Sequence, residues 1–215
     1  MLDILRRIVQ EVSSATDLSD ALNVVVARIR EAMRTEVCSV YLFDADSKRY
    51  VLMATEGLNP EAVGRVSLSS SQGLVGLVGS REEPINVDNA PAHPKFHFLS
   101  ETGEDPFLSF LGVPIIHHKR LMGVMLAQQR DSRPFDESEE AFLVTMSAQL
   151  AGVIAHAEAT GNILDMSGHS KERRSTRFNG APGAPGVGIG TVYVLSPPAD
   201  LSGVVDREAE SAAEE

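Results

Sequence analysis

Two kinds of hydrophobic periodicity alternate along the first 160 residues, and this alternation constrains the fold most strongly. Apolar residues at helical spacing predict two amphipathic helices at the start, through Ile4, Ile8, Val9 and Val12 and then Leu22, Val25, Val26, Ile29 and Met33. A third stripe comprises Phe142, Leu143, Met146, Leu150, Val153 and Ile154. Between these stripes lie short β-branched and aromatic segments. Helices must therefore flank a central, mostly antiparallel sheet, which defines an α+β domain over residues 1–160.

The predicted sheet contains two strand pairs. Val37 to Asp44 and Tyr50 to Thr55 form the first pair around a polar turn, and Phe107 to His117 and Leu121 to Gln129 form the second. Pro84 to Val87 is a further short strand. The segment from Asp88 to Pro106 lacks periodicity, so we expect a long loop of the kind that often carries function.

Several local signals mark where helices begin. Asp17 is a candidate N-cap for the second helix, and Asp136 with Glu139 three residues later matches a capping box for the last one. Gly73 to Gly79 predicts a short helix that packs closely against the sheet through its glycines. The alternative is that its first backbone N–H groups lie near an anion.

Charge and cysteine content exclude several function classes. The net charge is -11, whereas nucleic-acid binding needs a basic face, so we expect no nucleic-acid partner. Cys38 is the single cysteine and can form neither an intrachain disulfide nor a cysteine cage for zinc. The first ten residues mix charge with apolar residues, unlike a signal peptide, and the run from Phe142 to Ala157 looks too short for a bilayer. We therefore expect a cytoplasmic protein with no membrane contact.

A glycine- and proline-rich stretch divides the rest of the chain. Residues 161–179 are predicted to be a linker, and residues 180–215 to be the incomplete start of another domain. The glycines at 180, 183 and 186 provide too few triplets for collagen, and those at 186, 188 and 190 do not match a dinucleotide-binding motif.

A metal site is not predicted. His93 and His97 have the spacing of helical ligands, but Pro94 lies between them and no cysteine cluster accompanies them. His117 and His118 are read as solvated turn residues.

Strand alternation predicts a pocket. Cys38, Val40 and Leu42 share one face of the first strand, which should meet the long helices, whereas Ser39 and Tyr41 should face a cavity under the long loop. The predicted ligand-binding residues are Ser39, Tyr41, Met53, Thr55, Phe96, Phe98, Ser109 and Gln128. The alternative is that this face is a second core layer containing a few satisfied hydroxyl groups.

Local strings carry a resemblance to a known family. Thr35 to Leu42, Val51 to Leu58, Gly73 to Gly79, Phe110 to Ile116 and Phe135 to Thr145, in this order of elements, resemble a GAF domain. Together they are similar to the N-terminal GAF domain of the nitrogen-type Enzyme I family of phosphoenolpyruvate-protein phosphotransferases, over about three quarters of the chain. Gly183 to Leu195 resembles the opening strand of that family's phosphotransfer domain.

The resemblance implies a regulatory role. The family autophosphorylates from phosphoenolpyruvate with magnesium, on a histidine in a glycine-rich motif, and passes the phosphoryl group to an HPr-like carrier. The chain has no such motif, so we expect no catalytic residue, no cofactor and no activity in this chain alone, and contact with the carrier only through further domains. The resemblance implies glutamine or 2-oxoglutarate as the effector that tunes autophosphorylation.

Two other readings remain open. The chain could be a GAF interaction module without a ligand, forming a homodimer through its first and last helices with residues such as Ile154. It could also be a GAF-type methionine sulfoxide reductase, although that chemistry needs several cysteines and only Cys38 is present.

Overall fold

The computed structural model describes residues 2–102 and 107–161. The predicted linker beyond residue 161 and the predicted segment 180–215 lie outside the described residues.

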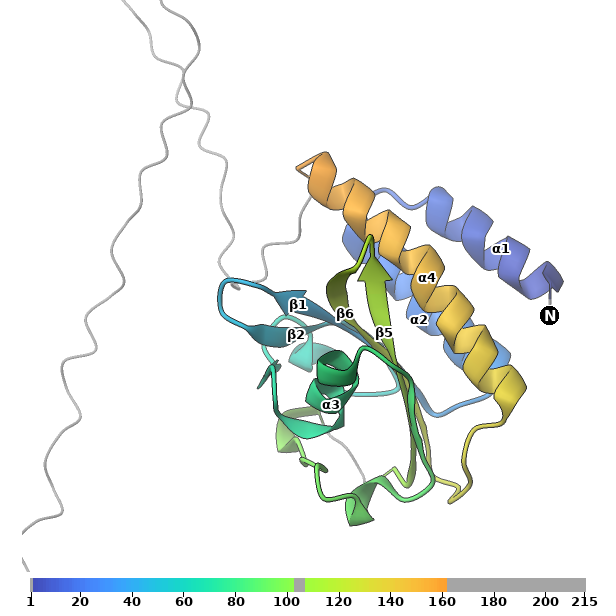
Figure 1. Cartoon of the computed structure of the whole chain (residues 1–215). Helices are drawn as coiled ribbons and strands as arrows, with labels where there is room; N and C mark the ends of the chain where they lie inside the picture. The colour runs from blue at the N-terminus through green and yellow to red at the C-terminus, as the bar shows by residue number, and fades with distance from the viewer. Residues whose placement is uncertain (1, 103–106, 162–215) are drawn as a thin grey trace, which may run out of the picture. The chain divides into compact units, whose positions relative to one another are not determined.

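A curled, antiparallel six-stranded sheet forms the centre of the domain (Figure 1). Its spatial order is β3-β2-β1-β6-β5-β4. The strands are β1 (Val37–Asp44), β2 (Arg49–Glu56), β3 (Ser67–Ser69), β4 (Ile85–Val87), β5 (Ser109–His117) and β6 (Arg120–Gln129). The α+β prediction is thus confirmed. Sequence reasoning missed β3 because its three residues, Ser67, Leu68 and Ser69, are too few to show alternation.

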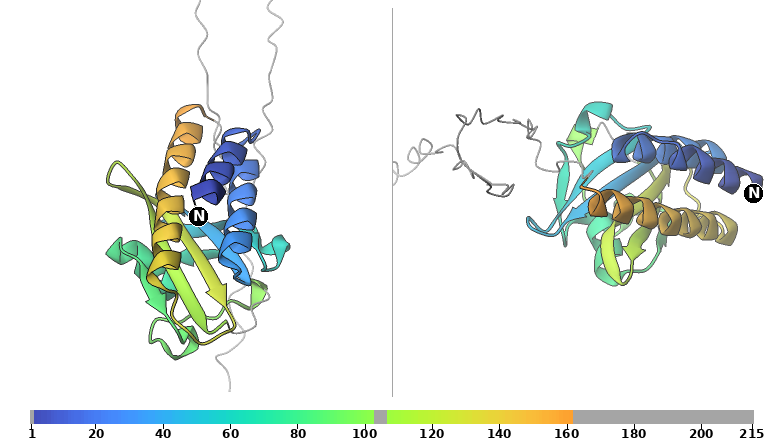
Figure 2. Two further views of the ribbon diagram at one scale, coloured as in Figure 1. Left: turned by 90° about the vertical axis from the view of Figure 1, so that its right-hand side faces the viewer. Right: turned by 90° about the horizontal axis from the view of Figure 1, so that it is seen from above.

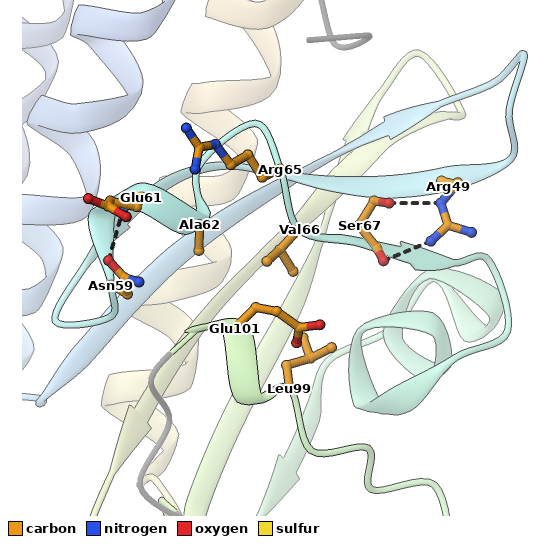
Figure 3. Close-up of a pocket in the computed structure, with 9 residues that line it drawn as sticks. All are labelled: Arg49, Asn59, Glu61, Ala62, Arg65, Val66, Ser67, Leu99 and Glu101. Carbon is orange, nitrogen blue, oxygen red and sulfur yellow. Dashed lines mark hydrogen bonds between the residues drawn. The ribbon is translucent and has the colours of Figure 1, made fainter.

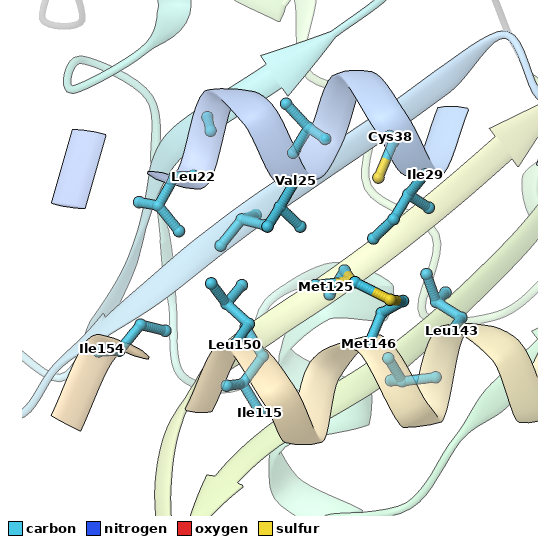
Figure 4. Packing of buried hydrophobic residues seen from close by; sticks show 14 of the residues in the cluster. Leu22, Val25, Ile29, Cys38, Ile115, Met125, Leu143, Met146, Leu150 and Ile154 are labelled. Carbon is cyan, nitrogen blue, oxygen red and sulfur yellow. The ribbon is translucent and has the colours of Figure 1, made fainter. Parts of the chain in front are cut away.

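One face of the sheet carries the long helices, as the views in Figures 1 and 2 show. These are α2 (Leu18–Met33) and α4 (Glu137–Ala159), while α1 (Leu2–Ser13) packs on α2. The side chains between them form the larger core, part of which is drawn in Figure 4. Cys38, Val40 and Leu42 belong to this core, which confirms the face predicted to meet the helices.

The opposite face of the sheet carries α3 (Gly73–Arg81) and the segment from β4 to β5, which contains the short 3-10 turns Ala90–Ala92 and Ser100–Thr102. A third such turn, Pro60–Ala62, precedes β3. A second apolar cluster fills this side and includes Tyr41, Tyr50, Leu52 and Phe110.

The predicted helix starts are confirmed. The Asp17 carboxylate accepts a hydrogen bond from the backbone N–H of Asp20 at 2.8 Å. Asp136 and Glu139 form the reciprocal capping box at the start of α4.

The helix α4 is longer than its apolar run suggested. It has 23 residues and is long and apolar enough to cross a membrane by length and composition alone. Its buried side chains, among them Leu143, Met146 and Leu150, pack in the larger core instead. Ile154 is also buried, at 2% exposed, so the expectation that it remains for a partner helix is wrong.

Candidate functional site

A small pocket lies between the sheet and the segment that crosses it, and we call it the inner pocket. Its floor is formed by β-strand residues and its walls by the start of α3 and the loop before β5. The lining residues are Tyr41, Leu68, Gly73, Leu74, Val75, Ala90, Phe96, His97, Leu99, Phe110, Leu126 and Gln128. Its volume is about 40 Å³, which accommodates only a few water molecules.

Gln128 is the polar side chain of the pocket floor. It lies on β6 opposite Phe110 of β5 and is 8% exposed. Its Oε1 is buried and has no hydrogen-bond partner in the described part of the chain. An unsatisfied buried acceptor costs about 1–3 kcal/mol, so this amide would gain from a bound donor.

Backbone donors lie at another wall of the inner pocket. The helix α3 begins there with Gly73, Leu74 and Val75, and the side chain of its N-cap residue, Gln72, makes no capping hydrogen bond. The first turn of a helix has N–H groups without intrahelical partners. The pocket therefore offers donors from α3 and an acceptor from Gln128.

A side-chain pair joins the loop to α3 at the pocket. Nε2 of Gln72 lies 2.6 Å from Nε2 of His97, and Oε1 of Gln72 accepts the N–H of Ser69 at 3.1 Å. Because Oε1 of Gln72 accepts the Ser69 N–H, its Nε2 is the amide nitrogen, which can only donate, and Nε2 of His97 is the acceptor. We call this pair the clasp.

A larger and more polar cavity adjoins the inner pocket, and we call it the outer cleft (Figure 3). It measures about 430 Å³. It is lined by Arg49, Asn59, Glu61, Ala62, Arg65, Val66, Ser67, Leu99 and Glu101. Leu99 lines both cavities and so lies between them.

The structure brings three of the predicted ligand-binding residues together. Tyr41, Phe96 and Gln128 all line the inner pocket, although they come from β1, the loop and β6. Whether they bind a ligand stays a prediction.

Ser39 and Thr55 lie on the side of the sheet that carries the inner pocket, but they do not line it. They are directly opposite each other on β1 and β2, and their hydroxyl oxygens are 2.7 Å apart. Each hydroxyl therefore has a hydrogen-bond partner within the sheet. For this pair, the structure agrees with the alternative reading, in which this face is a second core layer with satisfied hydroxyl groups.

Met53 lies on the other face, so its predicted placement beside Tyr41 is wrong. The pairing of β1 with β2 shifts register between Val40 and Tyr41, because a bulge inserts one extra residue in β2. Met53 and Ala54 both face the larger core, and alternation resumes with Thr55 on the pocket side.

Ser109 and Phe98 are also away from the inner pocket. Ser109 pairs with Gln129, the residue after Gln128, so its side chain and that of Gln128 are on opposite faces of the sheet. Its hydroxyl forms hydrogen bonds with the backbone of Asp131 and Arg133. It therefore braces the connection from β6 to α4. Phe98 is 50% exposed and does not line the pocket.

Sequence reasoning missed most of the apolar lining. Leu126 could have been found from strand alternation, since it lies two residues before Gln128 on β6, whereas Phe110 is opposite Gln128 only through the register of β5 against β6. Leu68, Ala90, His97 and Leu99 come from short or aperiodic segments, which give no alternation to follow.

Cys38 has no features of a reactive thiol. It is buried in the larger core, and this burial raises the pKa of its thiol well above the ordinary value. Within residues 2–102 and 107–161, no cluster of three or more histidine, cysteine or acidic residues is placed to hold a metal ion.

Comparisons with known proteins agree with this architecture. The GAF domain family model matches residues 17–154. The GAF domain from a phosphoenolpyruvate-protein phosphotransferase of Coxiella burnetii is 48% identical, with a TM-score of 0.73 over 76% of this chain and 97% of that one. The corresponding Acinetobacter domain is 51% identical, with a TM-score of 0.69 over 75% and 97%.

A full-length relative extends the same similarity. A Salmonella typhimurium protein described as "Phosphoenolpyruvate-dependent phosphotransferase system" is 47% identical over 191 residues, which are 89% of this chain and 25% of the relative. The chain thus spans about a quarter of the length of the curated relatives it matches. It belongs to the GAF domain family, and its domain is of the kind that phosphoenolpyruvate-protein phosphotransferases carry.

Proposed function

We propose that this GAF domain senses a small polar molecule in the inner pocket and thereby regulates a phosphoenolpyruvate-protein phosphotransferase. The observation that carries the proposal is the buried amide of Gln128, whose Oε1 has no hydrogen-bond partner among the described residues. Aromatic and aliphatic side chains surround it in the pocket. Apolar walls with a few convergent polar groups are typical of small-molecule sites.

Binding requires the pocket to enlarge. Its volume of about 40 Å³ is far below the hundreds of cubic ångströms typical of ligand sites. Phe96, His97 and Leu99 come from the loop that closes it, and the clasp is one of the contacts holding this loop. We propose that the ligand displaces the loop and breaks the clasp.

Displacement of the loop supplies a route to regulation. A ligand that binds the open and closed forms unequally shifts their populations, and the shift reaches any attached element that differs between them. Glutamine and 2-oxoglutarate are the effectors we propose, in a cytoplasmic, nitrogen-related setting. The regulated step is autophosphorylation from phosphoenolpyruvate with magnesium, followed by transfer to an HPr-like carrier, through domains beyond this chain.

Calorimetric titration of the 215-residue chain with glutamine, 2-oxoglutarate and nucleotides tests the sensing role. We expect one of these compounds to bind, and we expect Gln128→Leu to weaken that binding by about tenfold, because the variant keeps the side-chain volume but loses the amide. Gln149→Leu on the exposed face of α4 is the matched control and should bind as the wild type does. Binding that is equal in both variants would contradict the pocket assignment.

A second candidate function is self-association through α4. Its outward face contains exposed Val144, Ala148 and Gly152, and no Asp, Glu, Lys or Arg occurs from Ala141 to Ala157. An uncharged helix face with small residues allows close approach of another helix. We propose a homodimer that uses this face.

Light scattering of the chain over a range of concentrations tests the dimer. Ala148→Glu should convert a dimer to a monomer, since it places a charge in the centre of the face, whereas Glu137→Gln at the start of α4 should leave the mass unchanged. A wild-type protein that stays monomeric at high concentration rejects this candidate.

A further inference from the structure

Three backbone N–H groups at the start of α3 have no hydrogen-bond partner among the described residues. They belong to Gly73, Leu74 and Val75, the first three residues of the helix, and no acceptor for them is found within residues 2–102 and 107–161. The first N–H groups of a helix need an acceptor from outside the helix. All three residues are buried and line the inner pocket, so the pocket is where such an acceptor would lie.

The conformation of Gly73 turns these N–H groups toward a common point. Its φ of 69° is left-handed and the next residue is helical, which is the backbone arrangement called a nest. Successive N–H groups of a nest converge on an anion, and the positive end of the helix dipole adds to the attraction. The start of α3 is therefore shaped for an anion.

Gln128 identifies what this anion must carry. Its side chain is 8% exposed and lines the same pocket, and its Oε1 has no hydrogen-bond partner in the described part of the chain. A carbonyl oxygen accepts hydrogen bonds and repels another acceptor. An anion that contacts both α3 and Gln128 therefore needs an O–H group as well as bare oxygen atoms.

The size of the inner pocket limits the ligand to a compact ion. Its volume is about 40 Å³, so the groups that line it are close enough to contact one small molecule. A tetrahedral oxyanion takes about the room of a few water molecules, whereas an amino acid or a nucleotide is larger than the closed pocket. Among such oxyanions, phosphate keeps an O–H group near neutral pH and sulfate does not.

We propose that the closed inner pocket binds protonated inorganic phosphate. Its bare oxygen atoms accept hydrogen bonds from the N–H groups of α3, and its hydroxyl donates to Oε1 of Gln128. Backbone N–H groups at a helix start are a common way to bind phosphate. The proposal shares the pocket with the sensing function but does not rest on it, because the ion fits while the loop stays closed and the larger effectors need the loop displaced.

Amide chemical shifts of the isotope-labelled 215-residue chain locate the ion. Addition of phosphate should shift the amide proton signals of Gly73, Leu74 and Val75 downfield, because these groups gain charge-assisted hydrogen bonds. The amides of Glu61 and Arg65, which line the outer cleft, should not shift. Shifts in the outer cleft instead would assign the ion to the arginine side chains there and overturn the proposal.

Calorimetry tests the need for the O–H group. At matched ionic strength, phosphate should bind at least about tenfold more tightly than sulfate, which has the same shape but no proton to donate. Gln128→Leu should remove this preference, since it keeps the side-chain volume but loses the acceptor. Arg65→Gln in the outer cleft is the control and should retain the preference. The melting temperature of each variant checks its folding.

A phosphate ester distinguishes the free ion from a phosphorylated compound. Glycerol 3-phosphate should bind at least about tenfold more weakly than phosphate, because the closed pocket has no room for the glycerol group. Equal or tighter binding of the ester overturns the free ion as the ligand. Equal binding of phosphate and sulfate, or binding of neither, also overturns the proposal, whereas the sensing function is decided separately by the titrations with glutamine, 2-oxoglutarate and nucleotides.

Discussion

The phenolic oxygen of Tyr50 occupies the space that a side chain at Gly79 would need. A β-carbon at Gly79 would lie 1.7 Å from this oxygen, and Tyr50 is only 1% exposed, so the ring cannot easily move aside. Burial, with a smaller effect of Glu82, also raises the pKa of Tyr50. The contact sets how closely α3 approaches the sheet below the inner pocket.

Gly79→Ala should therefore destabilise the domain by about 2 kcal/mol, because the added methyl group forces α3 or the ring to shift. Denaturation with urea measures the change. Gly152→Ala, measured at a concentration where the protein is monomeric, is the matched control, since a β-carbon at Gly152 meets nothing within 4 Å of the same chain, and it should stabilise the monomer by about 0.5–1 kcal/mol through helix propensity. Equal effects of the two substitutions would show that the close approach at Tyr50 is unimportant.

Ser39 and Thr55 should stabilise the sheet cooperatively. Their hydroxyls are 2.7 Å apart and Ser39 is fully buried. Ser39→Ala and Thr55→Val should each cost about 1 kcal/mol, and the double variant should cost clearly less than the sum, because the second change no longer breaks a bond. A double-mutant cycle from urea midpoints measures this coupling, and strict additivity would argue against the hydrogen bond.

Glu139 should make the stability of the domain depend on pH. Arg133 donates two hydrogen bonds of 2.8 Å to its carboxylate, and these lower the pKa of Glu139 in the folded protein. Its contribution is complete above the unfolded pKa of about 4.3 and is lost as pH falls through the lower folded value. Glu139→Gln should cost about 1 kcal/mol at pH 7, a modest amount because Arg133 is half exposed, and less at pH 3, where more of the carboxyl group is protonated.

Glu137→Gln is the control for this prediction. Glu137 is also in the first turn of α4 but belongs to neither the capping box nor the Arg133 pair. Glu137→Gln should therefore change the free energy of unfolding only slightly at pH 7. A cost of Glu139→Gln that is the same at both pH values would contradict the pH argument.

Cys38 should react with thiol reagents only after unfolding. The thiol is fully buried, and desolvation raises its pKa, so little thiolate forms at neutral pH. Labelling with a disulfide reagent should be slow in buffer and complete in concentrated urea. Rapid labelling of the native protein would mean that the core around β1 opens, and it would reopen the possibility of thiol chemistry.

Strand alternation predicted the faces of β1 correctly. Cys38, Val40 and Leu42 meet the helices, and Tyr41 lies on the pocket side, because side chains of an uninterrupted strand must alternate. The same rule failed for Met53, since a bulge is a property of the pairing between β1 and β2 and leaves no mark in the spacing of β2 alone. The prediction for Ser109 was wrong because the face that it shares with residues of β6 depends on the register of β5 against β6.

The sequence by itself determined the helices with their caps, most of the strands and the membership in the GAF family, because periodicity, capping residues and local motifs are properties of neighbouring positions. Only the tertiary structure decided which residues surround the inner pocket and the outer cleft. Leu99 and Glu101 come from an aperiodic loop, and Arg49 and Gln128 from different strands. Such residues meet only when the sheet has its final register and the loop has closed over it, and these are long-range contacts that no local pattern encodes.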